Sequence, residues 1–333
     1  MTLRELNRAT LARQLLLVRA RQSVSRALER IGGIQAQDVG APYDALFARL
    51  EGFRAETLER ALDRRLAVKA TLMRGTLHLV SVRDYPSFHA AVLPSLRRYY
   101  SRTSFKGTPM QIEALAERAL AFASEPRTYG ELREHLGGEA EFFRARFHAP
   151  FVYAPPITRR PRLVAARSWL DAEPVPEEEA IAHLVRRYLA AFGPATPRDA
   201  ARWSGIPVSA ARAALERIRT IDLGDGHLDL VRAPRPGEVA APPRLLPLFE
   251  SILLAYDDRS RFLTKEHYDR VMLGGIVLKA FLVDGIVAGV WRTERDTLTL
   301  EPFAPLPRVA RRELEDEARG VAAFHGAAKV RFG

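Results

Sequence analysis

Cysteine is absent from this chain of 333 residues, which excludes disulfide bonds, thiolate nucleophiles and cysteine-ligated zinc or iron–sulfur sites. The eight histidines are scattered, and none lies four residues after another, so no metal site is expected. No apolar run is long enough to span a bilayer, and the first residues lack the apolar core of a signal peptide. We therefore expect a cytoplasmic protein that needs no cofactor and does not enter a membrane.

Lysine is scarce, but positive charge is not. The chain has five lysines and 46 arginines against 40 acidic residues, which gives a formal net charge of +11. A GC-rich genome favours arginine codons over lysine codons, but it does not explain an excess of positive over negative charge. Arginine makes bidentate contacts with phosphate and enters narrow minor grooves. The charge balance therefore indicates a nucleic-acid partner.

Three common enzyme motifs are also missing. The sequence has no Gly-x-x-x-x-Gly-Lys phosphate loop, no Gly-x-Gly-x-x-Gly and no Gly-x-Ser-x-Gly. ATPase, dehydrogenase and serine-hydrolase activities therefore lack their main signals. The adjacent carboxylates of Asp257 and Asp258 point apart on a strand or turn, so we expect them in salt bridges.

The first segment, residues 1–105, has the pattern of several helices followed by a hairpin. Apolar spacing predicts helices over residues 4–18, 24–31 and 55–65, and another from Pro42 to Leu50. The second of these is capped by Ser23 and ends at two glycines. Residues 67–82 alternate and are interrupted by Arg74 and a glycine, which predicts a hairpin. Helices followed by a hairpin form a winged helix, a variant of the helix-turn-helix module.

The same layout recurs in residues 106–172 and 173–236. The second copy has predicted helices at 109–123 and after Thr128, and strands at 151–153 and 163–165. The third copy has a helix at 177–192, a second helix capped by Thr196, and a third at 208–215 in the position of a recognition helix. An Asp-Gly turn then predicts a hairpin at 221–230. Three such copies are a repeat of architecture rather than of sequence.

Residues 244–333 differ from the preceding copies. Short strands are predicted on both sides of Gly274-Gly275, on both sides of Asp284-Gly285 and at 297–300, and a helix at 309–324 closes the chain. Several short strands in such a segment are typical of a small barrel or a curled sheet. The sequence therefore predicts an α+β fold, mainly helical, with tandem winged helix-turn-helix modules and a small C-terminal β-barrel.

Gln35 and Gln37 lie in the run Ile34-Gln35-Ala36-Gln37-Asp38, between two predicted helices. A buried amide costs free energy unless it is hydrogen-bonded, so a placed pair suggests a site, although a polar turn is the simpler alternative. Glutamine does not titrate, but it can orient a water molecule, and its oxygen can stabilise a developing positive charge. That chemistry suits cleavage of a glycosidic bond to an activated leaving group, such as a cationic N7-alkylated purine. Asp38 either adds a carboxylate or, as we favour, caps the next helix.

The two predicted wings carry candidate DNA contacts. The loop of the second hairpin holds Arg159, Arg160 and Arg162, which either contact phosphate or remain solvated. In the first hairpin, Arg74 can reach phosphate from the turn. His78 either faces DNA or packs within its strand.

The third copy adds two more cations. Arg202 and Arg212 lie on its second and third predicted helices, where they either bind the DNA backbone or solvate a helix face. Trp203 is expected in the core rather than as a wedge between bases. The acidic hairpin of this copy argues against a contact between that wing and DNA.

Four runs of sequence resemble the bacterial winged-helix DNA glycosylases of the AlkZ and YcaQ type. The Gln-x-Gln run resembles the AlkZ branch, because the YcaQ branch carries Gln-x-Asp at that point. The resemblance spans nearly the full chain and rests on these segments in this order: residues 34–38, 74–79, 245–250 with 256–259, and 282–292.

The resemblance implies tandem winged helices that form a concave basic surface, followed by a C-terminal barrel. It implies a monofunctional DNA glycosylase that releases N7-alkylated purines, in some members bulky or crosslinked ones, with Gln35 and Gln37 as the catalytic pair. A hairpin of the family probes DNA. We place this hairpin at residues 271–279, which include Gly274, Gly275 and Lys279.

We therefore expect a monomeric, nucleoid-associated enzyme that acts on duplex DNA carrying alkylated purines. The alternative is a winged-helix DNA-binding protein or transcriptional regulator without catalysis, and a third possibility is a protein that coats DNA. A regulator usually dimerises on a palindrome, whereas three different modules in one chain suit one surface on one duplex.

Overall fold

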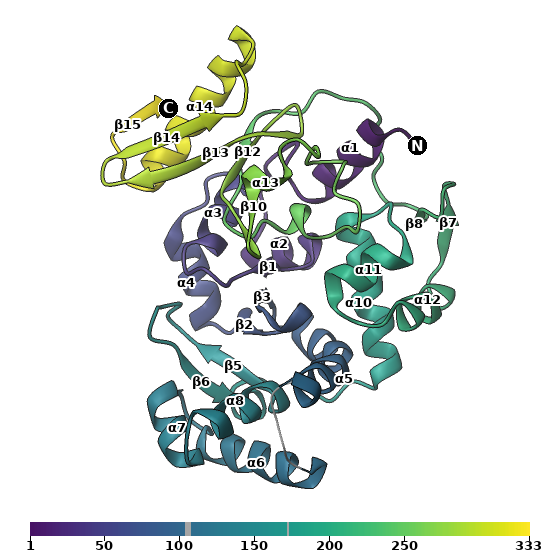
Figure 1. The fold of residues 1–333 in the computed structure, drawn as a ribbon, viewed down its shortest axis with the longest axis vertical. Helices are drawn as coiled ribbons and strands as arrows, with labels where there is room; N and C mark the ends of the chain where they lie inside the picture. The colour runs from purple at the N-terminus through teal and green to yellow at the C-terminus, as the bar shows by residue number, and fades with distance from the viewer. Residues whose placement is uncertain (104–107, 172) are drawn as a thin grey trace.

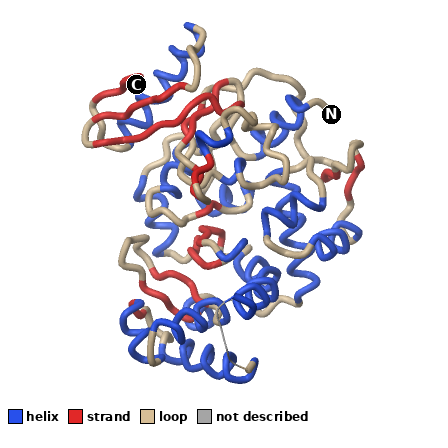
Figure 2. Tube along the Cα trace, viewed as in Figure 1, coloured by secondary structure: helices blue, strands red, loops and turns tan. Residues whose placement is uncertain are grey.

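The computed structural model describes the backbone of residues 1–103, 108–171 and 173–333, and their side chains except at 100–103 and 109. The predicted module boundaries at residues 105, 106 and 172 lie outside these described residues. Helices form most of the regular structure, and the strands gather in small groups between them (Figure 2). Within the described part of the chain, no helix is both long and apolar enough to cross a membrane.

One order of elements, helix–strand–helix–helix–strand–strand, occurs in residues 24–81, which we call the first unit. Ser23 accepts a hydrogen bond from the Arg26 N–H at the start of its first helix, and Gly32 ends that helix at a φ of 76°, as predicted. The elements are α2 (Val24–Ile31), β1 (Ile34–Gln35), α3 (Ala41–Arg49), α4 (Ala55–Asp63), β2 (Ala67–Thr71) and β3 (Leu77–Ser81).

The second unit, residues 109–165, repeats this order. Thr128 and Glu131 form the predicted capping box at its second helix. The elements are α6 (Pro109–Phe122), β4 (Arg127–Thr128), α7 (Tyr129–Leu136), α8 (Glu139–His148), β5 (Phe151–Ala154) and β6 (Arg162–Ala165).

The third unit, residues 177–230, has the same order, except that a single bridge between Ala195 and Leu228 replaces the first strand. Thr196 caps its second helix, as predicted, through a box with Asp199. The elements are α10 (Glu177–Phe192), α11 (Pro197–Ser204), α12 (Val208–Glu216), β7 (Thr220–Asp222) and β8 (Leu228–Leu230).

The hairpins of the first two units join into one six-stranded sheet with the order β1-β3-β2-β5-β6-β4. Strands β2 and β5 make the junction, where Lys69 is opposite Tyr153. One face of this sheet packs on α5 (Tyr85–Thr103) and α10 in the largest core. Figure 1 shows β1 and β3 near the centre, with the second unit below them and the third unit to the right.

The C-terminal segment is an open curled sheet, one of the two forms expected for it, rather than the small β-barrel. All of residues 244–333 are described, and β9 and β15 lie at opposite ends of the order β15-β14-β13-β12-β9. Strand β9 has only two residues, which is too short to pair with β15 and close a barrel. Helix α14 packs on the sheet instead. The elements are β9 (Arg244–Leu245), η2 (Ser251–Leu253), α13 (Tyr268–Val271), β10 (Met272–Leu273), β11 (Ile276–Val277), β12 (Ala280–Val283), β13 (Ile286–Glu294), β14 (Thr297–Pro302), α14 (Arg308–Phe324) and β15 (Lys329–Phe332).

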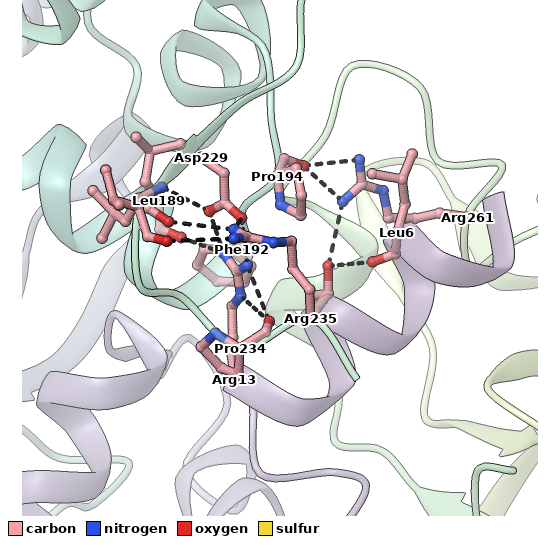
Figure 3. Close-up of polar contacts among 12 residues, drawn as sticks. Leu6, Arg13, Leu189, Phe192, Pro194, Asp229, Pro234, Arg235 and Arg261 are labelled. Atoms are coloured by element: carbon pink, nitrogen blue, oxygen red, sulfur yellow. Dashed lines mark hydrogen bonds and ion pairs between the residues drawn. The ribbon is translucent and has the colours of Figure 1, made fainter. Parts of the chain in front are cut away.

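The first helix, α1 (Leu3–Arg13), is shorter than the predicted 4–18, because the chain leaves the helix and Leu15 adopts a φ of 60°. Buried polar contacts join this helix to the third unit. Figure 3 shows Arg13 beside Asp229, with two hydrogen bonds of 2.8 Å between them. Arg261 of the C-terminal segment reaches the Pro194 carbonyl in the same view. It also donates to the hydroxyl of Thr10 on α1. The helix therefore links the third unit to the C-terminal segment.

Candidate catalytic site

Two glycines direct the chain from α2 into β1. Gly32 and Gly33 have φ angles of 76° and 86°, a region that disfavours other residues. A Cβ at Gly33 would lie 2.8 Å from a methyl carbon of Val80, so this close approach also requires glycine. The strand then pairs with β3, which places Gln35 opposite His78.

Gln35 is buried, with 5% of its surface exposed. Its side-chain oxygen Oε1 accepts a hydrogen bond from Nη2 of Arg74 at 3.0 Å. A guanidinium group only donates, so this contact fixes which end of the amide faces Arg74. Among the residues whose side chains are described, the Nε2 group of Gln35 has no hydrogen-bond partner.

Gln37 is exposed, two residues beyond its buried counterpart. Its Oε1 accepts a hydrogen bond from the backbone N–H of Leu77 at 3.2 Å. The described side chains and backbone offer no partner to its Nε2. Gln35, at the end of β1, and Gln37, two residues beyond it, therefore both have the side-chain oxygen held by a protein donor. Each keeps one oxygen lone pair and an amino group for other contacts.

Asp38 caps the next helix, as we favoured. Its Oδ1 accepts hydrogen bonds from the backbone N–H groups of Gly40 and Ala41 at 2.9 and 3.0 Å, at the start of α3. This cap fixes the chain directly after Gln37. The second carboxylate oxygen has no hydrogen bond to any described residue.

Arg74 lies in the turn η1 (Met73–Gly75) between β2 and β3, with a φ of 56°. Its guanidinium donates to Gln35 and to the backbone oxygen of Trp203 at the end of α11. Burial, followed by the charges of Arg202 and Arg259, lowers its pKa to about 10, so it remains a cation at neutral pH. The phosphate contact predicted for Arg74 is not supported, because its donors bind groups inside the protein.

His78 is also placed inside the protein, with 2% of its surface exposed. It is paired with Gln35 across β1 and β3, so both side chains project from the same face of the sheet. Burial, together with the nearby charge of Arg74, lowers its pKa to about 3. The predicted DNA contact is therefore wrong for His78, and the packed strand histidine is the correct alternative.

The other arginines predicted to contact DNA lie on the surface. Arg202 and Arg212 are exposed on α11 and α12, and Trp203 between them is in the core, as predicted. The remaining three are in or beside the exposed loop between β5 and β6: Arg159, Arg160 and Arg162. Their contacts with DNA remain predictions.

The predicted DNA-probing hairpin consists of β10 and β11, with exposed Gly274 and Gly275 at its turn. Lys279 follows this hairpin, but its Nζ lies 2.7 Å from a carboxylate oxygen of Asp44 on α3. The ion pair compensates part of the charge of Lys279, whose side chain stays partly exposed, and its contact with DNA remains a prediction.

Lys69 is a feature of this region that the sequence reasoning missed. It lies on β2 with 5% of its surface exposed, and its Nζ has no hydrogen-bond partner among the described residues. Burial lowers the pKa of Lys69 to about 8. The nearby charge of Asp38 acts to raise this pKa, and that of Arg146 acts to lower it. A signal was present, because a lysine in a strand between apolar neighbours is unusual in a chain with few lysines.

Comparisons with known proteins agree with this architecture. A family model described as DNA glycosylase AlkZ-like matches residues 28–324. A relative from Streptomyces sahachiroi, named interstrand DNA cross-link repair glycosylase, is 26% identical over 355 aligned positions that cover 96% of this chain and 95% of the relative. The solved structure of the Streptomyces sahachiroi DNA glycosylase AlkZ superposes with a TM-score of 0.86 at 22% identity, covering 100% of this chain and 99% of that one, and so has the same fold. The chain belongs to the AlkZ-like DNA glycosylases, enzymes of DNA repair.

Proposed function

We propose that this DNA glycosylase hydrolyses the N-glycosidic bond of N7-alkylated purines in duplex DNA, with Gln35 and Gln37 as its catalytic residues. The observation that carries the proposal is that Gln35, at the end of β1, and Gln37, two residues later, both have the side-chain oxygen held by a protein donor. The donor to Gln35 is Arg74, a cation without a carboxylate partner among the described residues. Arg202 and Arg259 add positive charge around Arg74. DNA phosphates are attracted to such a surface.

The chemistry follows from the charge of the lesion. A purine alkylated at N7 carries a formal positive charge, so it leaves as a neutral base. In the reaction a water oxygen bonds to C1′ of the sugar, the bond from C1′ to the purine nitrogen breaks, and its electron pair neutralises the ring. One proton of the water then passes to solvent. The transition state places positive charge on the sugar, as in other glycosidic cleavage.

Neutral amides suit this reaction because the leaving group needs no protonation. Gln35, fixed by Arg74, can donate from its amino group to an acceptor of the bound DNA. The free lone pair of Gln37 can hold the attacking water and face the positive charge that develops on the sugar. Preorganised dipoles of this kind stabilise developing charge without reorganising in the reaction. The exposure of Gln37 also leaves space for a bulky or crosslinked base.

The three units act as winged-helix modules that hold the duplex. Their common order of helices and strands is that of a winged helix, and their exposed arginines supply phosphate contacts. These contacts come from Arg159, Arg160 and Arg162 in the second unit and from Arg202 and Arg212 in the third. The exposed turn at Gly274-Gly275 enters a groove, and one monomer acts on one duplex.

The test is release of free N7-methylguanine from a methylated duplex under single-turnover conditions. Gln37→Ala and Gln35→Ala should each reduce the rate by about 100-fold, the effect of removing one positioned dipole, with little change in DNA affinity. Gln111→Ala, an exposed glutamine on α6, is the matched control and should release base at the normal rate. Undiminished release by Gln37→Ala would remove the proposed role of that residue, whereas DNA binding without any base release by the wild type would favour the non-catalytic DNA-binding alternative.

A further inference from the structure

The side chain of Arg74 joins two units that are distant in the sequence. In the first unit it donates to the side-chain oxygen of Gln35 at 3.0 Å. In the third unit it donates to the backbone oxygen of Trp203, in the last turn of α11. Carbonyl groups at the end of a helix lack partners within the helix, so this one is a natural acceptor for a cation.

Two features of Arg74 cost free energy in the folded protein. Its backbone is in the left-handed region at a φ of 56°, which is unusual for a residue other than glycine. Its side chain is partly buried, and no carboxylate of the described residues lies within ion-pair distance of its charge. Strained backbone and uncompensated, partly buried charge persist where the surrounding structure enforces them, often at functional sites.

Arg74 also lines a cavity of about 300 Å³, together with residues of α5 and of the end of α11. Val92 and Leu96 form part of its wall. Packing therefore leaves the side chain room to move, and the two hydrogen bonds determine where it lies. If either bond were lost, the orientation of the Gln35 amide would no longer be fixed.

The turn of the third unit lies directly against Arg74. A Cβ at Gly205 would be 3.1 Å from the backbone nitrogen of Arg74, so α11 ends in contact with η1. Helix α12, with exposed Arg212, begins three residues later. A DNA contact that moves α12 would therefore also move the turn that touches Arg74, the residue that holds Gln35.

From these relationships we infer that Arg74 is a positioning residue, which fixes the amide of Gln35 for the reaction and links that amide to the DNA-facing helices of the third unit. The inference rests on the proposed role of Gln35. As a positioning residue, Arg74 does not touch the reacting atoms. It acts through Gln35, so its effect must disappear when Gln35 is removed.

A double-mutant cycle tests this inference, with the single-turnover rate of base release and the affinity for DNA measured separately. Arg74→Met should slow release by at least 10-fold and change the dissociation constant for DNA by less than about threefold. Arg74→Lys retains a cation but lacks the planar fork that holds two acceptors in fixed directions, so it should recover part of the rate. The Arg74→Met and Gln35→Ala double variant should be no slower than Gln35→Ala alone.

Arg21→Met is the matched control, because Arg21 pairs with Glu51 on the surface and should leave both quantities unchanged. Equal slowing by Arg74→Met with and without Gln35 would overturn the inference, and so would a normal rate for Arg74→Met. If Arg74→Met does not fold, the cycle is run with Arg74→Lys and judged in the same way. A normal rate for Gln35→Ala would instead remove the proposed role of Gln35, so the two failures are distinguishable.

Discussion

Lys279 and Asp44 form an ion pair of 2.7 Å that joins the end of the β10–β11 hairpin to helix α3. His325 adds a second contact, with its Nε2 at 2.8 Å from the other carboxylate oxygen of Asp44. Burial acts to raise the pKa of Asp44, but His325 and Lys279 outweigh it and hold this pKa below its ordinary value. Helix α3 begins directly after the Gln-x-Gln run, so the hairpin is anchored to the element that supports the site.

Asp44→Asn should therefore destabilise the protein by about 1–3 kcal/mol, because it leaves Lys279 partly buried without its partner. Urea unfolding at neutral pH measures this loss. Adding Lys279→Met should cost less than the sum of the two single changes, since the unpaired charge is then gone. Additive losses would contradict the pairing. Glu51→Gln, in an exposed ion pair, is the control and should have no measurable effect.

Local signals in the sequence predicted most of the elements. Thr128 and Thr196 cap the helices they were expected to cap, and the Asp284-Gly285 turn joins β12 to β13. These features depend on residues within about four positions of each other, so one stretch of sequence contains the whole signal. Helix α1 was extended too far because Leu15 continues the apolar spacing of a helix that has already ended.

Pairings between distant segments were not predicted. The junction between β2 and β5 and the parallel strand β15 depend on contacts that no local pattern records. The same reason applies to the site. The Gln-x-Gln run is visible in the sequence, but the partners of Arg74 and Lys279 lie far along the chain. Arg74 was assigned to DNA from its place in a hairpin turn, and Lys279 from the DNA-probing hairpin that the resemblance implies. Buried partners of a charged residue are a property of the fold.

Asp229 should be among the most sensitive positions outside the site. Its side chain and that of Arg13 are almost fully buried, and two hydrogen bonds of 2.8 Å join them. Asp229→Asn leaves the guanidinium of Arg13 without its counter-charge and should reduce the free energy of unfolding by about 3–5 kcal/mol. Arg235 also contacts Asp229 but is partly exposed, so Arg235→Met should cost clearly less in the same urea titration. Equal losses of unfolding free energy in the two variants would show that the buried pair of Arg13 and Asp229 contributes nothing beyond the contact with Arg235.

His78 should make stability depend on pH. Its pKa is about 3 in the folded protein and about 6.5 when unfolded, so between these values only the unfolded chain binds the proton. The free energy of unfolding should therefore fall as the pH drops below about 6.5, by at most roughly 1.4 kcal/mol per pH unit from this residue. His78→Asn does not titrate and can still donate to the Thr76 carbonyl, so its denaturation midpoint should change less with pH. Parallel pH curves for the two proteins would exclude this role.

Lys69 should lower stability at neutral pH, because its buried ammonium has no acceptor among the described residues. Its folded pKa of about 8 lies below the ordinary 10.5, so the penalty is complete below pH 8 and disappears as the pH rises toward 10.5. Lys69→Met has a similar length and should raise the free energy of unfolding by about 1–3 kcal/mol at pH 7, with a smaller gain at pH 10. Lys265→Met, an exposed lysine, is the control and should show no such gain. A gain that is equal at pH 7 and pH 10 would mean that better apolar packing, rather than relief of a buried charge, stabilises the variant.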